Sequence, residues 1–298
     1  MILRIGTRKS KLALVQTQLV IAAIQKNFLH LECVIIPIIT TGDRITDRNL
    51  YDIGGKALFL KELEQALLDK QIDIAVHSLK DMPGNLPPLL EIAAVLERED
   101  PRDVFISYNY TSLMELPSKA IVGSSSVRRK LLMNKMRADL EFVMFRGNVE
   151  SRLNKVKNNE VTASILAAAG LRRLGLFNPA YCFPISVTDM IPAVGQGVIA
   201  VEINSENILA KAICEKINHL ETWKIIQVER SFMTYLDASC RTPLAAYAEY
   251  TNKTNFRSSF MLSDETGSKV RFHNAFGHID DAYDIGINTA KIMTSNQI

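Results

Sequence analysis

The chain has 298 residues, of which 47% are hydrophobic and 22% charged, so it can bury the cores of about two or three domains. Lys and Arg total 35 against 32 Asp and Glu, and the net charge of +3 excludes a general electrostatic attraction to nucleic acid or anionic lipid. No apolar run approaches the roughly 18 residues of a membrane span, and no basic and apolar leader opens the sequence. We therefore expect a cytoplasmic protein with no nucleic-acid or membrane partner.

The first hundred residues alternate between apolar runs and segments of helical periodicity. Strands are predicted at 2–5, 33–38 and 72–76, and helices at 10–28 and 58–68. Ser10 occupies an N-cap position, and Leu12, Val15 and Leu19 recur on one face of the helix that follows. This alternation favours parallel β-α-β units and places Arg8 at the carboxyl end of a strand.

Two polar segments interrupt this pattern. Residues 40–56 contain glycine and lack periodicity over a length that is unusual for a connection, so we expect a mobile active-site loop there. Residues 97–102 form a polar, hinge-like crossing, which predicts a domain boundary near Asp100. The alternation resumes in a second α/β lobe, with strands at 121–123, 142–145 and 163–166 and helices that begin at Ser125, Asn148 and Ala167.

The last hundred residues change character. A turn at 191–197 precedes an apolar strand at 198–203, which we expect to return to the first lobe. A small α+β domain is then predicted from a helix at 221–236, strands at 245–250, 256–262 and 270–276, and a closing helix at 282–292. The predicted division is a first domain of residues 1–98 and 197–217, a second of residues 99–196 and a third of residues 218–298.

Arginines gather in or beside Gly, Ser and Asn turns at the inferred strand-to-helix junctions of both lobes. Ligands of open α/β sheets bind at such junctions, where helix N-termini also favour anions. Because an arginine can hold a carboxylate through two hydrogen bonds, the set predicts a ligand with several carboxylates or phosphates. The alternative is that these residues are solvated surface charges. The set comprises Arg8, Arg128, Arg129, Arg146, Arg152, Arg172 and Arg173.

Nucleotide and metal sites find little support in the sequence. Residues 123–126 read Gly-Ser-Ser-Ser, but neither GxxxxGK[ST] nor GxGxxG is present. The four cysteines include no CxxC pair, and the five histidines include no HExxH pair. These patterns argue against a disulfide framework, a structural zinc site and a catalytic metal.

Two positions could carry proton-transfer or covalent chemistry. Asp81 follows an apolar strand and could act as general acid, general base or electrostatic stabiliser, while a carboxylate that caps a turn is an equal alternative. His77, at the end of the same strand, is interpreted as a core histidine. Cys240 lies in a loop beside Arg241 and could present a nucleophilic thiolate, although a semi-buried small residue is the commoner case. The other three cysteines are interpreted as packing residues.

Several of these segments carry short motifs in a characteristic order. They include Gly6-Thr7-Arg8-Lys9-Ser10, Thr41-Gly42-Asp43, Gly54-Gly55-Lys56, His77-Ser78-Leu79-Lys80-Asp81, Glu97-Arg98-Glu99-Asp100-Pro101-Arg102-Asp103, Gly123-Ser124-Ser125-Ser126-Val127-Arg128-Arg129, Arg146-Gly147-Asn148-Val149, Arg152-Leu153, Ala169-Gly170-Leu171-Arg172-Arg173-Leu174-Gly175, Pro192-Ala193-Val194-Gly195-Gln196-Gly197 and Cys240. On these motifs the chain resembles the hydroxymethylbilane synthase (porphobilinogen deaminase) family from residue 1 to about residue 243.

The resemblance implies an α/β fold of two lobes like those of type II periplasmic binding proteins, plus a small α+β C-terminal domain. It implies a transferase of tetrapyrrole (haem) biosynthesis that condenses four porphobilinogen molecules head to tail, with loss of ammonia, into hydroxymethylbilane. The implied cofactor is a dipyrromethane bound covalently to Cys240. The implied partner is the small-molecule substrate porphobilinogen, and we expect a monomer.

The resemblance also implies roles for individual residues. Asp81 would be the catalytic carboxylate, which holds pyrrole N–H groups and stabilises the azafulvene cation that forms when ammonia leaves. The implied cofactor ligands besides Cys240 are Ser78, Lys80, Ser124, Ser126, Arg128 and Arg129. The implied substrate ligands are Arg8, Ser10, Lys56, Phe59, Arg146, Arg152, Arg173 and Gln196.

One departure and one alternative function stay open. Asp237-Ala238-Ser239 precede Cys240, where relatives usually have one or two glycines, and glycine enters left-handed backbone conformations more freely than these residues. The backbone geometry of this loop is therefore in question. A non-catalytic, cytosolic carboxylate-binding sensor with the same two lobes is the alternative function. The presence of both Asp81 and Cys240 argues against a sensor.

Overall fold

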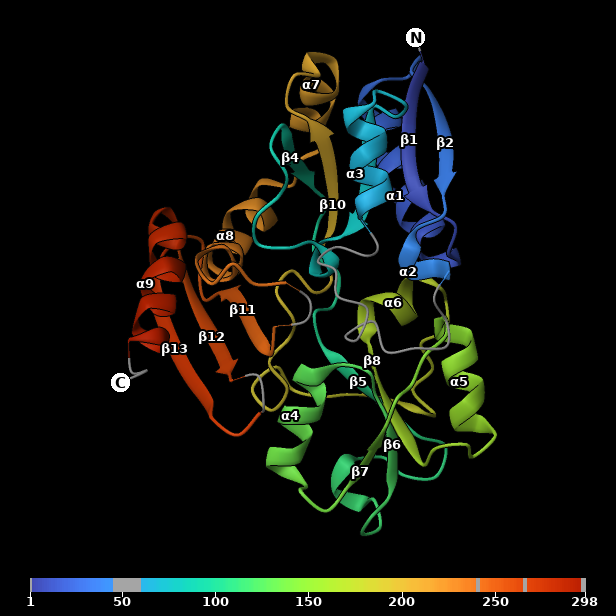
Figure 1. Ribbon diagram of the computed structural model, residues 1–298, viewed down its shortest axis with the longest axis vertical. Helices are drawn as coiled ribbons and strands as arrows, with labels where there is room; N and C mark the ends of the chain where they lie inside the picture. Colours follow the sequence, from blue (N-terminus) through green and yellow to red (C-terminus); the bar gives the residue numbers. More distant parts are fainter. Residues whose placement is uncertain (1, 45–59, 240–241, 265–266, 296–298) are drawn as a thin grey trace.

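The computed structural model describes residues 2–44, 60–239, 242–264 and 267–295. Its strands form three sheets that occupy separate regions of the molecule (Figure 1). We call the part built on sheet β2-β1-β3-β10-β4 the first lobe, the part built on β7-β6-β8-β5-β9 the second lobe, and the part built on β11-β12-β13 the third domain.

The first lobe is a five-stranded sheet with helices on both faces. β1 (Ile2–Arg8) pairs in parallel with β2 (Glu32–Ile38) and β3 (Ile74–Ser78), whereas β10 (Ile199–Asn204) runs antiparallel to β3 and to β4 (Leu90–Val95). One face packs against α1 (Lys11–Asn27) and α7 (Ile208–Ile217), and the other against α3 (Lys61–Leu68). A short helix, α2 (Thr41–Arg44), follows β2.

The second lobe repeats this plan. β6 (Ile121–Gly123) pairs in parallel with β7 (Glu141–Val143) and β8 (Ala163–Ala167), and β5 (Asp103–Ile106) runs antiparallel to β8 and to β9 (Cys182–Pro184). α4 (Val127–Met136) packs on one face, and α5 (Val149–Lys157) and α6 (Ala168–Arg173) on the other. The 3₁₀ turns η1 (Leu79–Asp81) and η2 (Leu113–Glu115) follow β3 and β5.

The chain passes from one lobe to the other at the fourth strand of each sheet. It leaves the first lobe after β4 and enters the second as β5, and it returns after β9 as β10. β5 lies between β8 and β9, and β10 lies between β3 and β4. Each of these two strands pairs with both of its neighbours. Both connections therefore end in a strand that is anchored inside a sheet.

The third domain is a three-stranded antiparallel sheet covered by two helices. β11 (Leu244–Tyr250), β12 (Asn255–Ser263) and β13 (Val270–His278) pair in sequence order. α8 (Leu220–Tyr235) and α9 (Ala282–Thr294), which follows η3 (Ile279–Asp281), pack together against them. Phe232 of α8 and Phe260 of β12 are fully buried, with ring centroids 4.8 Å apart. Figure 1 shows this domain beside both lobes.

The fold class expected from the sequence is confirmed: two α/β lobes and a small α+β domain. The strand predicted at 198–203 does return to the first lobe as β10. The expectation of a loop from Thr40 is wrong at its beginning, because residues 41–44 form α2, and residues 45–59 lie outside the described ranges. The sequence reasoning also missed β4, β5, β9 and α7. The predicted domain boundaries remain a prediction. Across the described ranges, no helix combines the length and apolar character that a membrane span requires.

One buried carboxylate ties the three parts together. Glu229, on α8, is fully buried and accepts hydrogen bonds from both terminal nitrogens of Arg98, each at 2.8 Å. It also accepts from the backbone N–H groups of Gly195 (2.8 Å) and Ala248 (2.9 Å). Arg98 belongs to the connection that leads to β5, Gly195 to the connection that leads to β10, and Ala248 to β11. Every polar contact of this carboxylate therefore joins α8 to a different part of the chain.

Glu229→Ala should lower the free energy of unfolding by about 3 to 5 kcal/mol, because it leaves the Arg98 guanidinium buried without its partner. Urea unfolding followed by circular dichroism measures this loss. Arg257→Ala is the control, since Arg257 pairs with Glu249 at the surface and should cost less than about 1 kcal/mol. Equal effects of the two substitutions would contradict the role given to Glu229.

Candidate active site

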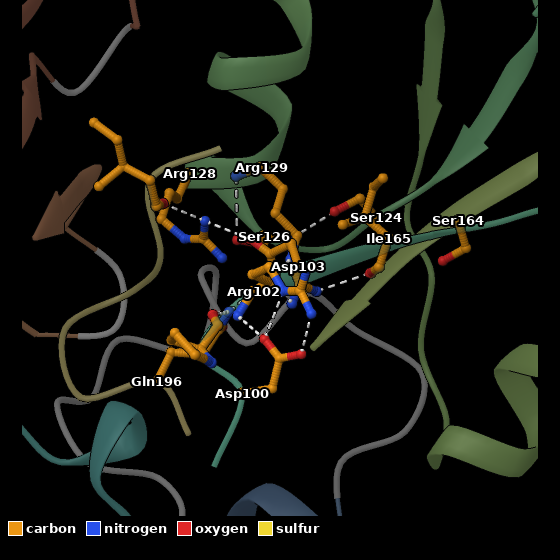
Figure 2. A network of polar contacts seen from close by, with 12 residues as sticks. Asp100, Arg102, Asp103, Ser124, Ser126, Arg128, Arg129, Ser164, Ile165 and Gln196 are labelled. Atoms are coloured by element: carbon orange, nitrogen blue, oxygen red, sulfur yellow. Dashed lines mark hydrogen bonds and ion pairs between the residues drawn. The ribbon is translucent and has the colours of Figure 1, made fainter. Parts of the chain in front are cut away.

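The candidate site is organised around a buried carboxylate at the start of β5. Asp103 is fully buried, and its Oδ2 lies 2.7 Å from Arg128 Nη1. Arg129 donates to Asp103 Oδ1 from Nε at 3.0 Å and from Nη2 at 2.7 Å. Arg128 also donates to Ile191 O at 2.6 Å, and Arg129 to Ile165 O at 2.8 Å. Figure 2 shows both guanidinium groups directed from α4 toward Asp103, so each is held in one place.

The local sequence explains why these two arginines lie at the end of β6. Ser126 is the N-cap of α4, and its hydroxyl accepts from the backbone N–H of Arg129 at 3.4 Å. Ser124 Oγ accepts from Ser126 N at 3.3 Å within the preceding turn. The cap starts the helix directly after the strand, which places Arg128 and Arg129 in the first helical turn. Both serines predicted as cofactor ligands are thus engaged in shaping the turn.

The two guanidinium groups decide the charge of Asp103. Burial alone would raise the pKa of this carboxyl, but Arg128 and Arg129 together hold the pKa well below its ordinary value. Burial also lowers the pKa of Arg129, and the contact with Asp103 counters that effect. The aspartate is therefore an ionised anchor that offsets part of the positive charge around it.

Further cations lie in the same region and lower one another's pKa values. Burial and the nearby Arg129 lower the pKa of Lys80 to about 8, although Asp81 and Asp103 act in the opposite direction. Burial lowers the pKa of Arg152 to about 10, with added repulsion from Arg129 and Arg146. The buried Arg152 Nε has no hydrogen-bond partner among the described residues. Cations that lower one another's pKa values, around the unpaired Arg152 Nε, fit a site for an anionic ligand.

We call Lys80, Arg128, Arg129, Arg146 and Arg152 the cationic cluster. Lys80 belongs to the first lobe and the four arginines to the second. The structure therefore brings together four of the arginines predicted at strand ends, and Lys80 from the other lobe lies with them.

Arg173 and Gln196 lie at the connection between the lobes. Arg173 Nη2 donates to Gly197 O at 2.7 Å, and burial lowers the pKa of this arginine while Glu99 raises it. Gln196 is buried and donates from Nε2 to Pro101 O at 2.7 Å and to Asp103 Oδ1 at 3.1 Å. Gln196 therefore links the returning connection to the same carboxylate that holds Arg128 and Arg129 (Figure 2). By contrast, Arg172 is exposed and pairs with Asp100 at 3.3 Å.

The first lobe contributes the ends of β1 and β3. Arg8 is the half-buried last residue of β1, and Ser10 is the N-cap of α1, accepting from Ala13 N at 3.2 Å. Lys11 of α1 forms an ion pair with Glu150 of α5, so the start of α1 faces the second lobe. Ser78 Oγ accepts from Gln16 Nε2 at 2.8 Å at the end of β3.

Asp81 ends η1 and is half-buried beside Lys80, whose pKa it raises. The burial of His77 agrees with its interpretation as a core residue; its Nε2 lies 2.9 Å from Glu202 Oε2, but neither atom makes a hydrogen bond among the described residues. The carboxylate of Asp81 and the cationic cluster therefore share one region, which the sequence motifs alone could not establish.

The predicted site residues Lys56, Phe59 and Cys240, together with Arg241, lie outside the described ranges. The approach to Cys240 is described as far as residue 239. Asp237 adopts a left-handed conformation (φ 44°), while Ala238 and Ser239 do not appear among the residues with positive φ. Aspartate tolerates the left-handed region better than most residues. The backbone at 238 and 239 therefore does not need the glycines that relatives usually have in this segment.

The remaining cysteines match their interpretation as packing residues. Burial raises the pKa of the Cys33 and Cys182 thiols and raises that of Cys214 to about 12. None of the three is thus set up as a thiolate at neutral pH. Within the ranges that the structure describes, no group of His, Cys, Asp and Glu is arranged to hold a metal ion.

Asp103 is the residue of the site that sequence reasoning missed. Its only signal was its place at the end of a polar, arginine-containing motif at 97–103. Its partners Arg128 and Arg129 are about 25 residues away, and only the antiparallel entry of β5 beside β8 brings them into contact.

Comparisons with known proteins identify the family of the chain. A family model described as "Porphobilinogen deaminase, dipyromethane cofactor binding domain" matches residues 3–212, and one described as "Porphobilinogen deaminase, C-terminal domain" matches residues 223–295. The chain is 56% identical to the porphobilinogen deaminase of Rickettsia canadensis, over 98% of this chain and 97% of that protein. It is 54% identical to that of Rickettsia prowazekii, over 99% of both chains.

Among solved structures, the chain is similar to the probable amino-acid ABC transporter extracellular-binding protein ytmK from Bacillus subtilis. The TM-score is 0.46 and the identity 12%, over 78% of this chain and 99% of that chain. A periplasmic binding protein of Salmonella typhimurium with high arginine specificity gives a TM-score of 0.41 and 15% identity, over 76% of this chain and 93% of that chain.

The two family models together span nearly all of the sequence, and both Rickettsia proteins are more than half identical to it from end to end. The chain therefore belongs to the porphobilinogen deaminase family.

Proposed function

We infer that this chain is a transferase that condenses four porphobilinogen molecules head to tail, with loss of ammonia at each step, into the linear tetrapyrrole hydroxymethylbilane. Family membership supports the reaction. The observation that carries the assignment to this site is the cationic cluster around the orphaned Arg152 Nε, because each porphobilinogen unit brings an acetate and a propionate.

The residues present fit a dipyrromethane cofactor. Its carboxylates would offset the mutual repulsion of Lys80, Arg129, Arg146 and Arg152, and would give Arg152 Nε an acceptor. When bound, the cofactor supplies the pyrrole end on which the product chain grows. Ser78, Ser124 and Ser126 lie at the ends of β3 and β6, and we propose them as supporting donors.

We propose Asp81 as the catalytic carboxylate. It follows β3 in a 3₁₀ turn, next to Lys80, and an ionised carboxylate there can accept hydrogen bonds from pyrrole N–H groups. It can also stabilise the positive charge that develops as ammonia leaves, and it can move a proton between the reacting groups. Burial favours the neutral form of the neighbouring Lys80, so this lysine could donate to or accept from the substrate near neutral pH.

Substrate carboxylates are assigned to Arg8, Arg146, Arg152 and Arg173, with Ser10 and Gln196 as neighbours and with Lys56 and Phe59 kept from the family resemblance. All three guanidinium nitrogens of Arg129 are committed to Asp103 and Ile165 O, and Arg128 is held through Nη1 by Asp103 and Ile191 O. We therefore propose that these two arginines present a fixed positive charge to the ligand. Arg152, whose Nε has no hydrogen-bond partner among the described residues, is proposed to bind a ligand carboxylate directly.

A non-catalytic carboxylate sensor would need the same cations but no carboxylate placed beside them. Asp81 next to Lys80 favours the enzyme. We also propose a monomer in the cytoplasm; Cys33, Cys182 and Cys214 are free thiols, which suits a reducing compartment.

Asp81→Asn should reduce porphobilinogen turnover about 10²- to 10⁴-fold, because an amide neither stabilises a developing cation nor transfers a proton. The melting temperature should stay near the parental value, since the side chain is only half-buried. Turnover is followed as hydroxymethylbilane formation by the purified variant. Asp284→Asn on the exposed face of α9 is the control. Parental turnover in Asp81→Asn would remove Asp81 from the mechanism.

Arg152→Gln and Arg146→Gln should stall chain growth, because each removes a charged donor whose hydrogen bonds contribute about 1.5 to 3 kcal/mol, or roughly 10- to 100-fold in binding. Mass spectra of the enzyme-bound intermediates should show shorter chains than in the parental protein. The cofactor-free form of Arg152→Gln should unfold at the same or a higher urea concentration, because a repulsive charge is gone. Arg257→Gln, on β12 of the third domain and paired with Glu249, should leave the mass distribution unchanged. A parental distribution in both cluster variants would contradict the assignment.

The dipyrromethane should be bound to Cys240, because burial keeps the thiols of Cys33, Cys182 and Cys214 protonated. Intact-mass analysis should show a two-pyrrole adduct that peptide mapping assigns to the Cys240 peptide and that Cys240→Ser lacks. An adduct on another cysteine, or full activity without any adduct, would overturn this attachment.

A further inference from the structure

Side chains from the last part of α8 form hydrogen bonds to the turn that follows Asp81. Arg230, which is only 9% exposed, donates from Nη1 to Pro83 O at 2.8 Å and from Nη2 to Gly84 O at 3.1 Å. One helical turn later, Thr234 Oγ1 donates to the same Gly84 O at 2.9 Å. Two side chains of the third domain thus hold two successive carbonyls of the first lobe.

The same turn also holds the segment that leaves α8. Gly84 N donates to Ala238 O at 3.0 Å, and Asn85 Nδ2 donates to Asp237 Oδ1 at 3.0 Å. Both backbone polar atoms of Gly84 therefore bond to the end of α8 or to the residues directly after it. Asp237 takes the left-handed conformation that turns the chain out of the helix (φ 44°).

Space makes glycine necessary at position 84. A Cβ there would lie 2.7 Å from Met233 O and 2.9 Å from both Met233 C and Thr234 Cα, all of them backbone atoms of α8. Backbone atoms of a helix cannot move aside as a flexible side chain can, so any larger residue must push the turn away from α8. The close approach of the two segments therefore depends on Gly84.

This contact lies between two chemically important positions in the chain. Asp81 is two residues before Pro83, and the intervening Met82 is fully buried. Cys240 is two residues after Ala238. The contact thus joins the segment that carries the proposed catalytic carboxylate to the segment that leads to the proposed attachment cysteine.

We propose that Gly84 and Thr234 are positioning residues that set residues 237–239, the approach to the proposed attachment cysteine, in register with the segment that carries Asp81. The proposal rests on the proposed function, namely on Asp81 as the catalytic group and Cys240 as the attachment point. Neither residue is in the cationic cluster, so the binding of substrate carboxylates should be affected much less than the coupling step and the loading of the cofactor.

Thr234→Val and Thr234→Ser form the matched pair for the test. Valine keeps the volume and removes the donor to Gly84 O, while serine keeps the donor. Cofactor-free protein is prepared in cells that make no porphobilinogen and is then given preformed hydroxymethylbilane, and intact mass follows the appearance of the adduct. Thr234→Val should load about three- to tenfold more slowly and lose a similar factor in kcat, as loss of one hydrogen bond predicts, with KM for porphobilinogen nearly unchanged. Thr234→Ser should restore loading and kcat.

Gly84→Ala should slow loading and kcat more than Thr234→Val, because a backbone displacement replaces a single lost bond. Gly170→Ala is the control, since a Cβ there meets only Leu12 Cδ2 at an ordinary 3.7 Å, and the variant should stay folded. All assays are run well below the melting temperature of each variant. If Gly84→Ala does not fold, the comparison of Thr234→Val with Thr234→Ser is sufficient to test the proposal.

Parental loading and kcat in Thr234→Val, with only a lowered melting temperature, would show a merely structural contact and overturn the proposal. Failure of Thr234→Ser to restore parental loading and kcat would also overturn the proposal. Failure of the proposed function gives a different result: the parental protein would carry its adduct away from Cys240, or Asp81→Asn would keep its activity. The two failures are therefore distinguished by measurements on different proteins.

Discussion

The arrangement of the three parts depends on the Glu229 carboxylate and its partner Arg98. A fully buried carboxylate is costly unless hydrogen bonds replace its hydration, and here four donors do so. Those donors come from the outgoing connection, the returning connection and β11, so the group is satisfied only when all three parts are assembled. This requirement favours one relative placement of the lobes and the third domain, and the contact between Gly84 and α8 then sets the segment after Asp81 against the segment before Cys240.

The cationic cluster illustrates the opposite condition, in which charges are brought together without full compensation. Asp103 offsets part of the charge of Arg128 and Arg129, yet the pKa values of Lys80 and Arg152 are lowered to about 8 and about 10. A site that is strained by like charges in the cofactor-free chain gains most when a polycarboxylate binds. The same physics makes the cofactor a stabilising ligand of the folded state, because it binds the assembled cluster and not the unfolded chain.

Much of the fold could be predicted because local signals agree with the tertiary structure. Ser10 caps α1 as predicted, and the helices expected from Ser125 and Asn148 begin one or two residues later as α4 and α5, behind the caps Ser126 and Asn148. The missed strands β5 and β9 are four and three residues long, and no predicted helix follows either of them to mark it as part of a β-α unit. They are strands because neighbours from distant parts of the chain supply their hydrogen bonds. The order of strands, with β5 and β10 inserted from the other lobe, depends on the same long-range pairing.

The sequence by itself determined the chemical inventory: arginines at strand ends, an aspartate after β3, one loop cysteine and the motif order of a family. Local rules were enough for this, since caps, turns and strand ends depend on residues a few positions apart. Only the tertiary structure decided which arginines are committed to Asp103, which donor is left without a partner, and how Gly84 meets α8. These contacts join residues far apart in the chain, and their geometry is set by packing against buried strands and helices, which no local pattern encodes.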